Sequence, residues 1–365
     1  MWKGTIRKIL LSLSFLITVT TTTIQGQTAE KPIVLWHGMG DSCCNPESMG
    51  RLEDLIQQLL PGTFVHSVQI GKTVKEDHEA GFFGIVNNQI DFVCEQLSNI
   101  PELKDGFNAI GFSQGGLFLR GYVERCNQPS VHKLITFGSP HGGVTDIPNC
   151  MNPGDLTCRL MRSMVRYGAY SSYVQHRVIQ AQYFKDPKNL QGYLDHNIFL
   201  PDLNNEFEGI KNKTYSDNLS SLDTFVMIRF ADDSMVKPGE TAWFWTYNDE
   251  HELVPLEHQS LYKEDWLGLR KLGGRLKFLV SPGQHMQITD DFFETQIVWP
   301  YLAAKDDKDS HHLNHNSGSS SISSSNGCSG GRNNNSDIIS SNGNSISISG
   351  SDTGVATPRL VHQQP

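Results

Sequence analysis

The sequence is short of hydrophobic side chains and of basic charge, and it lacks metal-binding patterns. Hydrophobic residues make up 38% of the 365 positions, which is low for a globular protein and indicates that part of the chain does not pack. The formal net charge of −9 argues against nucleic acid as a partner. Because no C-x-x-C pair or histidine cluster has the spacing of zinc ligands, we expect neither a metal site nor a cofactor.

Long apolar runs are also missing, except for one near the N-terminus. Lys3, Arg7 and Lys8 precede the run ILLSLSFLITV, and a polar stretch follows it. A basic start, a short apolar run and a polar exit are typical of a secretory signal peptide, which we place at residues 1–27. The run is too short to span a bilayer comfortably, so we expect a mature protein without a stable membrane span. The alternative is an uncleaved membrane anchor.

The C-terminal end accounts for the low hydrophobic content. From Ser310 onward the chain consists almost wholly of Ser, Asn and Gly, as in RNNNSDIISSNGNSISISG. Such a segment buries too little apolar surface to offset the entropy that is lost on ordering. Residues 305–365 are therefore predicted to be a disordered tail, with an adhesive or targeting role as the alternative. The packed domain is then expected at residues 28–304.

Cysteines and N-x-S/T sequons support export from the cytosol. One of the seven cysteines, Cys328, lies in the tail, and the other six suit three disulfides: Cys43, Cys44, Cys94, Cys126, Cys150 and Cys158. Sequons begin at Asn212, Asn218 and Asn334, and we treat all three as predicted glycosylation sites.

Within the packed region, compact apolar runs alternate with amphipathic segments. Strands are predicted at 32–37, 63–71, 107–111, 132–140, 224–230 and 276–280, and helices at 48–60, 79–98 and 114–125. This alternation predicts an α/β fold with a mostly parallel sheet and helices on both faces. It stops at residues 141–222, an insertion rich in Met, Tyr and Leu. Either this insertion is a helical cap with its own small core, or cap and sheet enclose an apolar groove suited to an acyl chain.

The segment NAIGFSQGG carries a G-x-S-x-G pattern around Ser113. The pattern is typical of a nucleophile elbow, a sharp strand-to-helix turn with the serine at its apex, but alone it is weak in a chain with 33 glycines. A base is supplied by His285, directly after a predicted strand. Asp232 and Asp233 follow an earlier strand, and the residues alone do not choose between them. The chain order serine, acid, histidine is the one that such an elbow requires.

An acyl-transfer site also needs backbone N–H donors for the oxyanion of its intermediate. Gln114, the residue after the serine, supplies one at the start of its helix. The loop HGMG follows the first strand, and its glycines allow close approach to a substrate, so Met39 is the second candidate donor. A simple turn is the alternative reading of that loop.

Five segments together closely resemble lysosomal palmitoyl-protein thioesterase, from about residue 30 to residue 303. They are LWHGMGDSCCNPESMG, AIGFSQGGLFLRGYVERC, ITFGSPHGGV, FVMIRFADDSMVKPGETAWF and GQHMQIT. The resemblance implies an α/β-hydrolase fold and removal of palmitate and similar acyl groups from S-acylated cysteines of proteins or peptides. It also implies that the protein acts in the lysosome, which it reaches through the secretory pathway, and that some of it is also secreted.

Carried over residue by residue, the resemblance assigns the site. It makes Ser113 the nucleophile, His285 the base and Asp233, rather than Asp232, the acid, with Met39 and Gln114 at the oxyanion-hole positions. It pairs the cysteines as Cys43–Cys44, Cys94–Cys126 and Cys150–Cys158. The sequon at Asn212 matches a family position, whereas Asp232 replaces an asparagine that begins a sequon in the family. The tail with Cys328 has no counterpart.

Two other functions remain open at this point. A lipase or esterase that cleaves oxygen esters would use the same three side chains, and GSPHGG is also lipase-like. A secreted lipid-binding protein on an inactive hydrolase scaffold is the other rival. The presence of a serine, an acid and a histidine in the required order argues against it.

Overall fold

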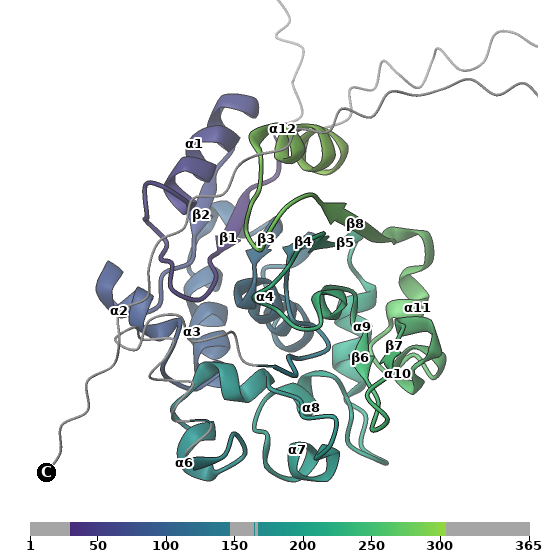
Figure 1. Ribbon diagram of the computed structural model, residues 1–365. Helices are drawn as coiled ribbons and strands as arrows, with labels where there is room; N and C mark the ends of the chain where they lie inside the picture. The colour runs from purple at the N-terminus through teal and green to yellow at the C-terminus, as the bar shows by residue number, and fades with distance from the viewer. Residues whose placement is uncertain (1–29, 147–163, 165–166, 304–365) are drawn as a thin grey trace, which may run out of the picture. The chain divides into compact units, whose positions relative to one another are not determined.

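The computed structural model describes residues 30–146, 164 and 167–303, and its centre is a six-stranded sheet (Figure 1). The strand order is β2-β1-β3-β4-β5-β8, and every neighbouring pair is parallel. The strands are β1 (Ile33–Trp36), β2 (Val65–Ser67), β3 (Phe107–Phe112), β4 (Val131–Phe137), β5 (Thr224–Phe230) and β8 (Leu276–Ser281). This parallel sheet with intervening helices confirms the predicted α/β-hydrolase fold class.

Helices cover both faces of the sheet, and successive strand residues point to opposite faces. On one face lie α1 (Met49–Leu59) and α12 (Asp290–Phe293), which continues as the π-helical η6 (Glu294–Leu302). On the other lie α2 (Val74–Ala80), α3 (Val86–Ser98), η1 (Pro101–Leu103), α4 (Gln114–Arg125) and α9 (Lys213–Ser220). Ile33 and Leu35 belong to the hydrophobic core on the face covered by α1 and α12, and Val34 and Trp36 belong to the core on the face covered by α3 and α4. Because the central strands are buried on both faces, they read as continuous apolar runs.

Two predicted elements differ in extent from the observed ones. The helix predicted at 79–98 is two helices, α2 and α3, because the chain turns at Gly84, whose φ of 131° is open only to glycine. The strand predicted at 63–71 shrinks to Val65–Ser67. It lies at the edge of the sheet, where it pairs with β1 alone.

The insertion between β4 and β5 is helical where it is described. Its elements are α6 (Ser172–Gln175), η2 (Ile179–Tyr183), α7 (Leu190–His196) and α8 (Leu200–Leu203), followed by α9. Phe199, Leu200 and Leu203 share a core with α3 and α4, so this part of the insertion is anchored to the sheet domain. Met164 packs in a smaller cluster with Phe82. Met161 and Val165 of the same insertion lie outside the described residues.

A further insertion, between β5 and β8, has no counterpart in the sequence-based expectation. It contains η3 (Gly239–Trp243), a hairpin of β6 (Thr246–Tyr247) and β7 (Leu253–Val254), η4 (Leu256–His258), α10 (Ser260–Lys263), α11 (Leu269–Leu272) and η5 (Gly273–Arg275). Its elements are too short for periodicity to reveal.

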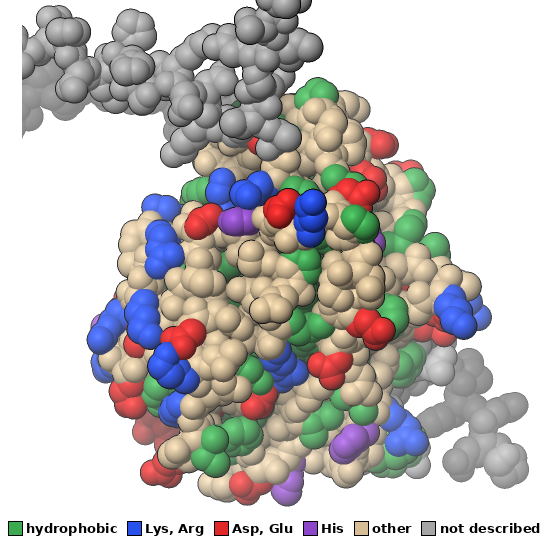
Figure 2. Space-filling view, turned by 180° about the vertical axis from the view of Figure 1, so that it is seen from behind, with side chains coloured by type: hydrophobic (Ala, Val, Ile, Leu, Met, Phe, Trp, Pro, Cys, Tyr) green, Lys and Arg blue, Asp and Glu red, His purple; other side chains and the backbone are tan. Residues whose placement is uncertain are grey.

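The predicted signal peptide and tail, Cys150, Cys158, Cys328 and Asn334 lie outside the described residues. None of the helices in the described part of the chain has both the length and the apolar character needed to cross a membrane. On the face turned away from the viewer in Figure 1, basic and acidic side chains are interspersed (Figure 2).

Candidate active site

Ser113 sits at a sharp turn between β3 and α4. Its φ of 52° and ψ of −125° are strained for a residue with a side chain. The turn needs glycine on both sides. A Cβ atom at Gly111 would lie 2.2 Å from the Cα of Gly116, and one at Gly115 would lie 2.3 Å from the carbonyl oxygen of Trp36. The backbone N–H of Ser113 donates to the carbonyl of Phe137 (2.7 Å), which ties the turn to β4.

Three side chains from three loops meet above this turn. The Ser113 hydroxyl lies 3.0 Å from Nε2 of His285, and Nδ1 of His285 lies 2.7 Å from Oδ2 of Asp233. An ionised carboxylate only accepts hydrogen bonds, so Nδ1 donates to Asp233 and Nε2 is left to accept the serine proton. The structure thus brings together three residues that stand 172 and 52 positions apart in the sequence.

Asp233 and Asp232 occupy different environments although they are neighbours. The Asp233 side chain is 2% exposed, and its second oxygen accepts the backbone N–H groups of Met235 and Val236, both at 2.9 Å. Asp232 is exposed to solvent. Only Asp233 is therefore in contact with the imidazole of His285.

The amide of Gln114 is held at the start of α4 by its own side chain. The Gln114 side-chain nitrogen donates to the carbonyl of Gly81 (2.9 Å), and its oxygen accepts from Gln180 (3.1 Å) and from the Tyr183 hydroxyl (3.0 Å). Gln180 and Tyr183 belong to η2 of the insertion. The first backbone N–H groups of a helix have no partner within it, so this amide is available to a substrate oxygen.

The other loop beside the serine contains Met39. A Cβ atom at Gly38 would lie 3.1 Å from the Cβ of Ser113, so the loop runs directly against the nucleophile. Met39 and Ser113 line the same cavity. Met39 therefore lies beside Ser113, and its role as an oxyanion donor stays a prediction.

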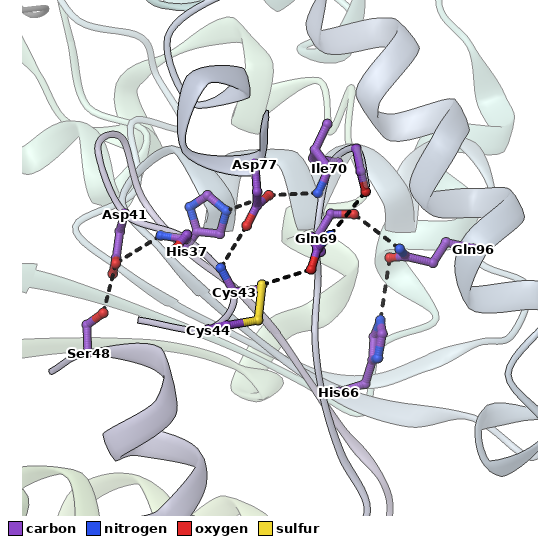
Figure 3. The surroundings of a disulfide bond; sticks show 12 residues. His37, Asp41, Cys43, Cys44, Ser48, His66, Gln69, Ile70, Asp77 and Gln96 are labelled. Carbon is purple, nitrogen blue, oxygen red and sulfur yellow. Dashed lines mark hydrogen bonds and ion pairs between the residues drawn. A yellow bond between two sulfur atoms is a disulfide. The ribbon is translucent and has the colours of Figure 1, made fainter. Parts of the chain in front are cut away.

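His37 and Asp77 form a buried pair next to the loop that contains Asp41 and Cys43 (Figure 3). Nε2 of His37 is 3.1 Å from Asp77, whose two oxygens accept the backbone N–H groups of Cys43 and Ile70, both at 2.7 Å. Burial acts to lower the pKa of His37, but the hydrogen bond and charge of Asp77 outweigh it and leave that pKa raised. Sequence reasoning missed this pair, because nothing in the pattern of α2 singles out Asp77.

Two disulfides join residues of the described chain. They are Cys43–Cys44, in the loop just described, and Cys94–Cys126, which links α3 to the end of α4. Both are pairs that the family resemblance implied. Among the described residues no group of three or more His, Cys, Asp or Glu side chains could hold a metal ion.

A cavity of about 330 Å³ opens onto Ser113 and His285. Its walls come both from the loops of the sheet and from the insertion, which contributes Val144, Tyr183 and Phe184. Methionine side chains are frequent in the lining: Met39, Met49, Met164, Met235 and Met286. The described part of the insertion thus has a small core of its own and also borders an apolar cavity together with the loops of the sheet. Flexible thioether side chains suit a long, mobile apolar ligand.

The two described sequons differ in accessibility. Asn212 is exposed at the start of α9, where its side-chain oxygen caps the helix by accepting from the N–H of Thr214 (3.0 Å). The nitrogen of Asn218 donates to the carbonyl of Glu124 (3.1 Å). A glycan on Asn218 would disturb that bond to α4.

Comparison with known proteins points to a single family. The family model described as palmitoyl protein thioesterase matches residues 32–285. Palmitoyl-protein thioesterase 1 of Caenorhabditis elegans is 41% identical over 291 residues, covering 79% of this chain and 97% of its own. Palmitoyl-protein thioesterase 3 of Dictyostelium discoideum is 34% identical, covering 80% and 98%. A protein of Drosophila melanogaster named lysosomal thioesterase PPT2 homolog is 27% identical, covering 78% and 96%.

Proposed function

The chain belongs to the palmitoyl protein thioesterase family, a family of hydrolases, and on that premise we propose that it removes long-chain fatty acyl groups, palmitate above all, from S-acylated cysteines of proteins or peptides. The observation that carries this proposal is the chain of hydrogen bonds from Ser113 through His285 to Asp233 at the mouth of an apolar cavity.

The proposed reaction has two halves, and His285 acts in both. Ser113 Oγ attacks the thioester carbonyl carbon while Nε2 of His285 takes its proton, and the resulting oxyanion accepts from the amides of Met39 and Gln114. The carbon–sulfur bond then breaks, the thiol leaves with the proton from His285, and the acyl group stays on Ser113. Water, deprotonated by His285, attacks the acyl-serine, releases the fatty acid and restores the serine. Asp233 holds the imidazole tautomer and stabilises the imidazolium.

The acyl chain is assigned to the methionine-lined cavity on the side of the insertion. Val144, Tyr183 and Phe184 offer a continuous apolar wall there, and the flexible Met164 and Met235 can adapt to the chain. Tyr183 also bonds Gln114, so the wall that contacts the acyl chain and the amide that holds the oxyanion are connected.

The compartment and the domain boundaries are part of the same proposal. We assign residues 1–27 to a signal peptide, 28–304 to the hydrolase domain and 305–365 to a tail, and we place the enzyme in the lysosome or outside the cell. Support comes from the name of the Drosophila relative, lysosomal thioesterase PPT2 homolog, and from the two disulfides, which suit an oxidising route. Of the two described sequons, Asn212 is the better acceptor, because among the described residues its side-chain nitrogen donates no hydrogen bond that a glycan would displace.

The test is release of palmitate from an S-palmitoyl cysteine peptide and from the matched O-palmitoyl serine peptide, with the wild type and with Ser113→Ala. We expect selective thioester cleavage, reduced roughly 10⁴-fold or more in the variant, because residual activity without the nucleophile is small. Selective oxygen-ester cleavage would make the protein a lipase. Cleavage of neither substrate, with no labelling of Ser113 by a fluorophosphonate, would favour the lipid-binding protein.

A further inference from the structure

A second, smaller cavity adjoins the active site between α1 and α12, and we call it the α1–α12 pocket. Its volume is about 100 Å³, and its walls are mainly apolar: Leu52 and Leu55 from α1, Phe293 from α12, and Phe112, Met286 and Ile288. Cavities of roughly 150 Å³ hold benzene in proteins, so this pocket has room for about one aliphatic side chain.

Two residues that line the pocket are sequence neighbours of Ser113 and His285. Phe112 directly precedes Ser113, and Met286 directly follows His285. Met286 has a φ of 64°, an unfavourable value for a residue with a side chain, and it lines both the main cavity and the pocket. Ser48 and Met49 are likewise shared by the two linings. The pocket and the main cavity therefore adjoin each other at Ser48, Met49 and Met286.

The chemistry decides which part of a thioester faces this pocket. His285 must return its proton to the departing sulfur, so the leaving group has to lie on the side of the imidazole. The segment that follows His285, from Met286 to Phe293, forms one wall of the α1–α12 pocket. The insertion, which forms the larger apolar wall, stands on the side of Gln114.

The outer side of the pocket is bounded by an ion pair. Arg51 of α1 and Asp290 of α12 contact each other, and both line the pocket with half-exposed side chains. A pocket bounded in this way suits a single short side chain better than the length of a fatty acyl chain.

We propose that the α1–α12 pocket is a leaving-group subsite that takes an aliphatic side chain next to the acylated cysteine of a peptide substrate. This inference rests on the proposed thioesterase function and extends it to the peptide part of the substrate. Peptides with leucine beside the S-palmitoyl cysteine should be cleaved with a kcat/KM about tenfold above peptides with alanine there, a ratio typical of one aliphatic contact.

The experiment measures this leucine-to-alanine ratio, with leucine placed on either side of the cysteine, in the wild type and in Leu55→Trp. Leu55 is half-buried and lines the pocket, so the larger indole ring of a tryptophan there should fill it. The ratio should then fall to near one. Leu59→Trp is the matched control: it lies one turn further along α1, is also half-buried and does not line the pocket, so it should keep the wild-type ratio. Ile288→Phe fills the pocket from the opposite wall, should act like Leu55→Trp, and serves if that variant does not fold.

A ratio is insensitive to the fraction of enzyme that is folded, so it separates recognition from stability. A wild-type ratio of one, or an unchanged ratio in both pocket-filling variants, would overturn the inference. So would a shift in the preferred acyl length, because the pocket would then take the fatty chain. Palmitoyl N-acetylcysteamine, whose leaving group has no neighbouring side chain, tests the parent function separately: if the wild type does not cleave it, the thioesterase proposal itself fails and the subsite with it.

Discussion

At the scale of single residues, two adjacent aspartates offer the sharpest contrast in the site. Replacing Asp233 by Asn puts an amide beside Nδ1 of His285, which favours the wrong imidazole tautomer, so kcat for a palmitoyl thioester should fall by about 10⁴-fold. Asp232→Asn, one residue away and exposed, should stay within about twofold of the wild type. Steady-state kinetics on both variants checks this, and comparable losses in the two would refute the assignment of Asp233.

Asp232 and Asp233 also show the limit of what can be predicted from the sequence alone. Chain order and strand context were enough to select Ser113 and His285, because an elbow and a histidine after a late strand leave local traces. The choice between Asp232 and Asp233 depends on the loop after β5, where Asp233 turns inward and accepts the N–H groups of Met235 and Val236. Only the family resemblance favoured Asp233 beforehand. No pattern in the sequence pointed to Asp77, because its partners His37, Cys43 and Ile70 come from other elements.

At the scale of elements, the turn from β3 into α4 joins the proposed nucleophile, Ser113, to the loop of Met39, the proposed oxyanion donor. A Cβ atom at Gly115 would lie 2.3 Å from the carbonyl oxygen of Trp36 and 2.4 Å from that of His37, so Gly115→Ala must push α4 away from the end of β1. We expect a loss of about 1–3 kcal/mol in the free energy of unfolding. A drop in kcat should accompany it, because Gln114 and Met39 would separate.

Gly274→Ala is the control for that prediction, because a Cβ atom there meets nothing within 4 Å. It should change stability by no more than about 0.5 kcal/mol. Urea titration together with kinetics measures both effects. If Gly115→Ala kept the stability and kcat of the wild type, the tight packing of α4 on β1 would not be what positions the site.

The elements themselves were predictable where they are long and buried on one or both faces. The strands β1, β3, β4, β5 and β8 were located from compact apolar runs, α1 from its apolar face, and α4 from its place after the elbow. The region between β5 and β8 was not, because elements of two to five residues, such as the hairpin of β6 and β7, leave no periodic signal. The break between α2 and α3 depends on a single glycine conformation at Gly84.

At the scale of the whole molecule, the site is assembled from the carboxyl ends of parallel strands, which meet at one edge of the sheet. The loops after β1, β3, β5 and β8 supply Met39, Ser113, Asp233 and His285, and the insertion after β4 closes the cavity over them. Such an arrangement makes catalysis dependent on the fold as a whole. The buried pair of His37 and Asp77, next to the loop after β1, also links the stability of the molecule to pH.

The pair of His37 and Asp77 determines the direction in which stability changes with pH. Asp77, with a smaller contribution from Asp41, raises the pKa of His37 in the folded state against the opposing effect of burial. Folding therefore favours the protonated imidazole. The stabilisation is fully present below the ordinary histidine pKa of about 6.5 and is lost as pH rises from there through the raised pKa. Acidic conditions, as in the proposed lysosomal setting, keep the pair charged.

His37→Asn should consequently lower the free energy of unfolding most at pH 5, and the difference from the wild type should shrink as the pH rises above about 6.5. Urea midpoints at several pH values measure this difference directly. His132→Asn is the control, because its partner Asp223 has a side chain that is 62% exposed and solvent screens that pair. A deficit in His37→Asn that stayed constant or grew with pH would show that His37 stabilises the Met39 loop by packing alone, without its charge.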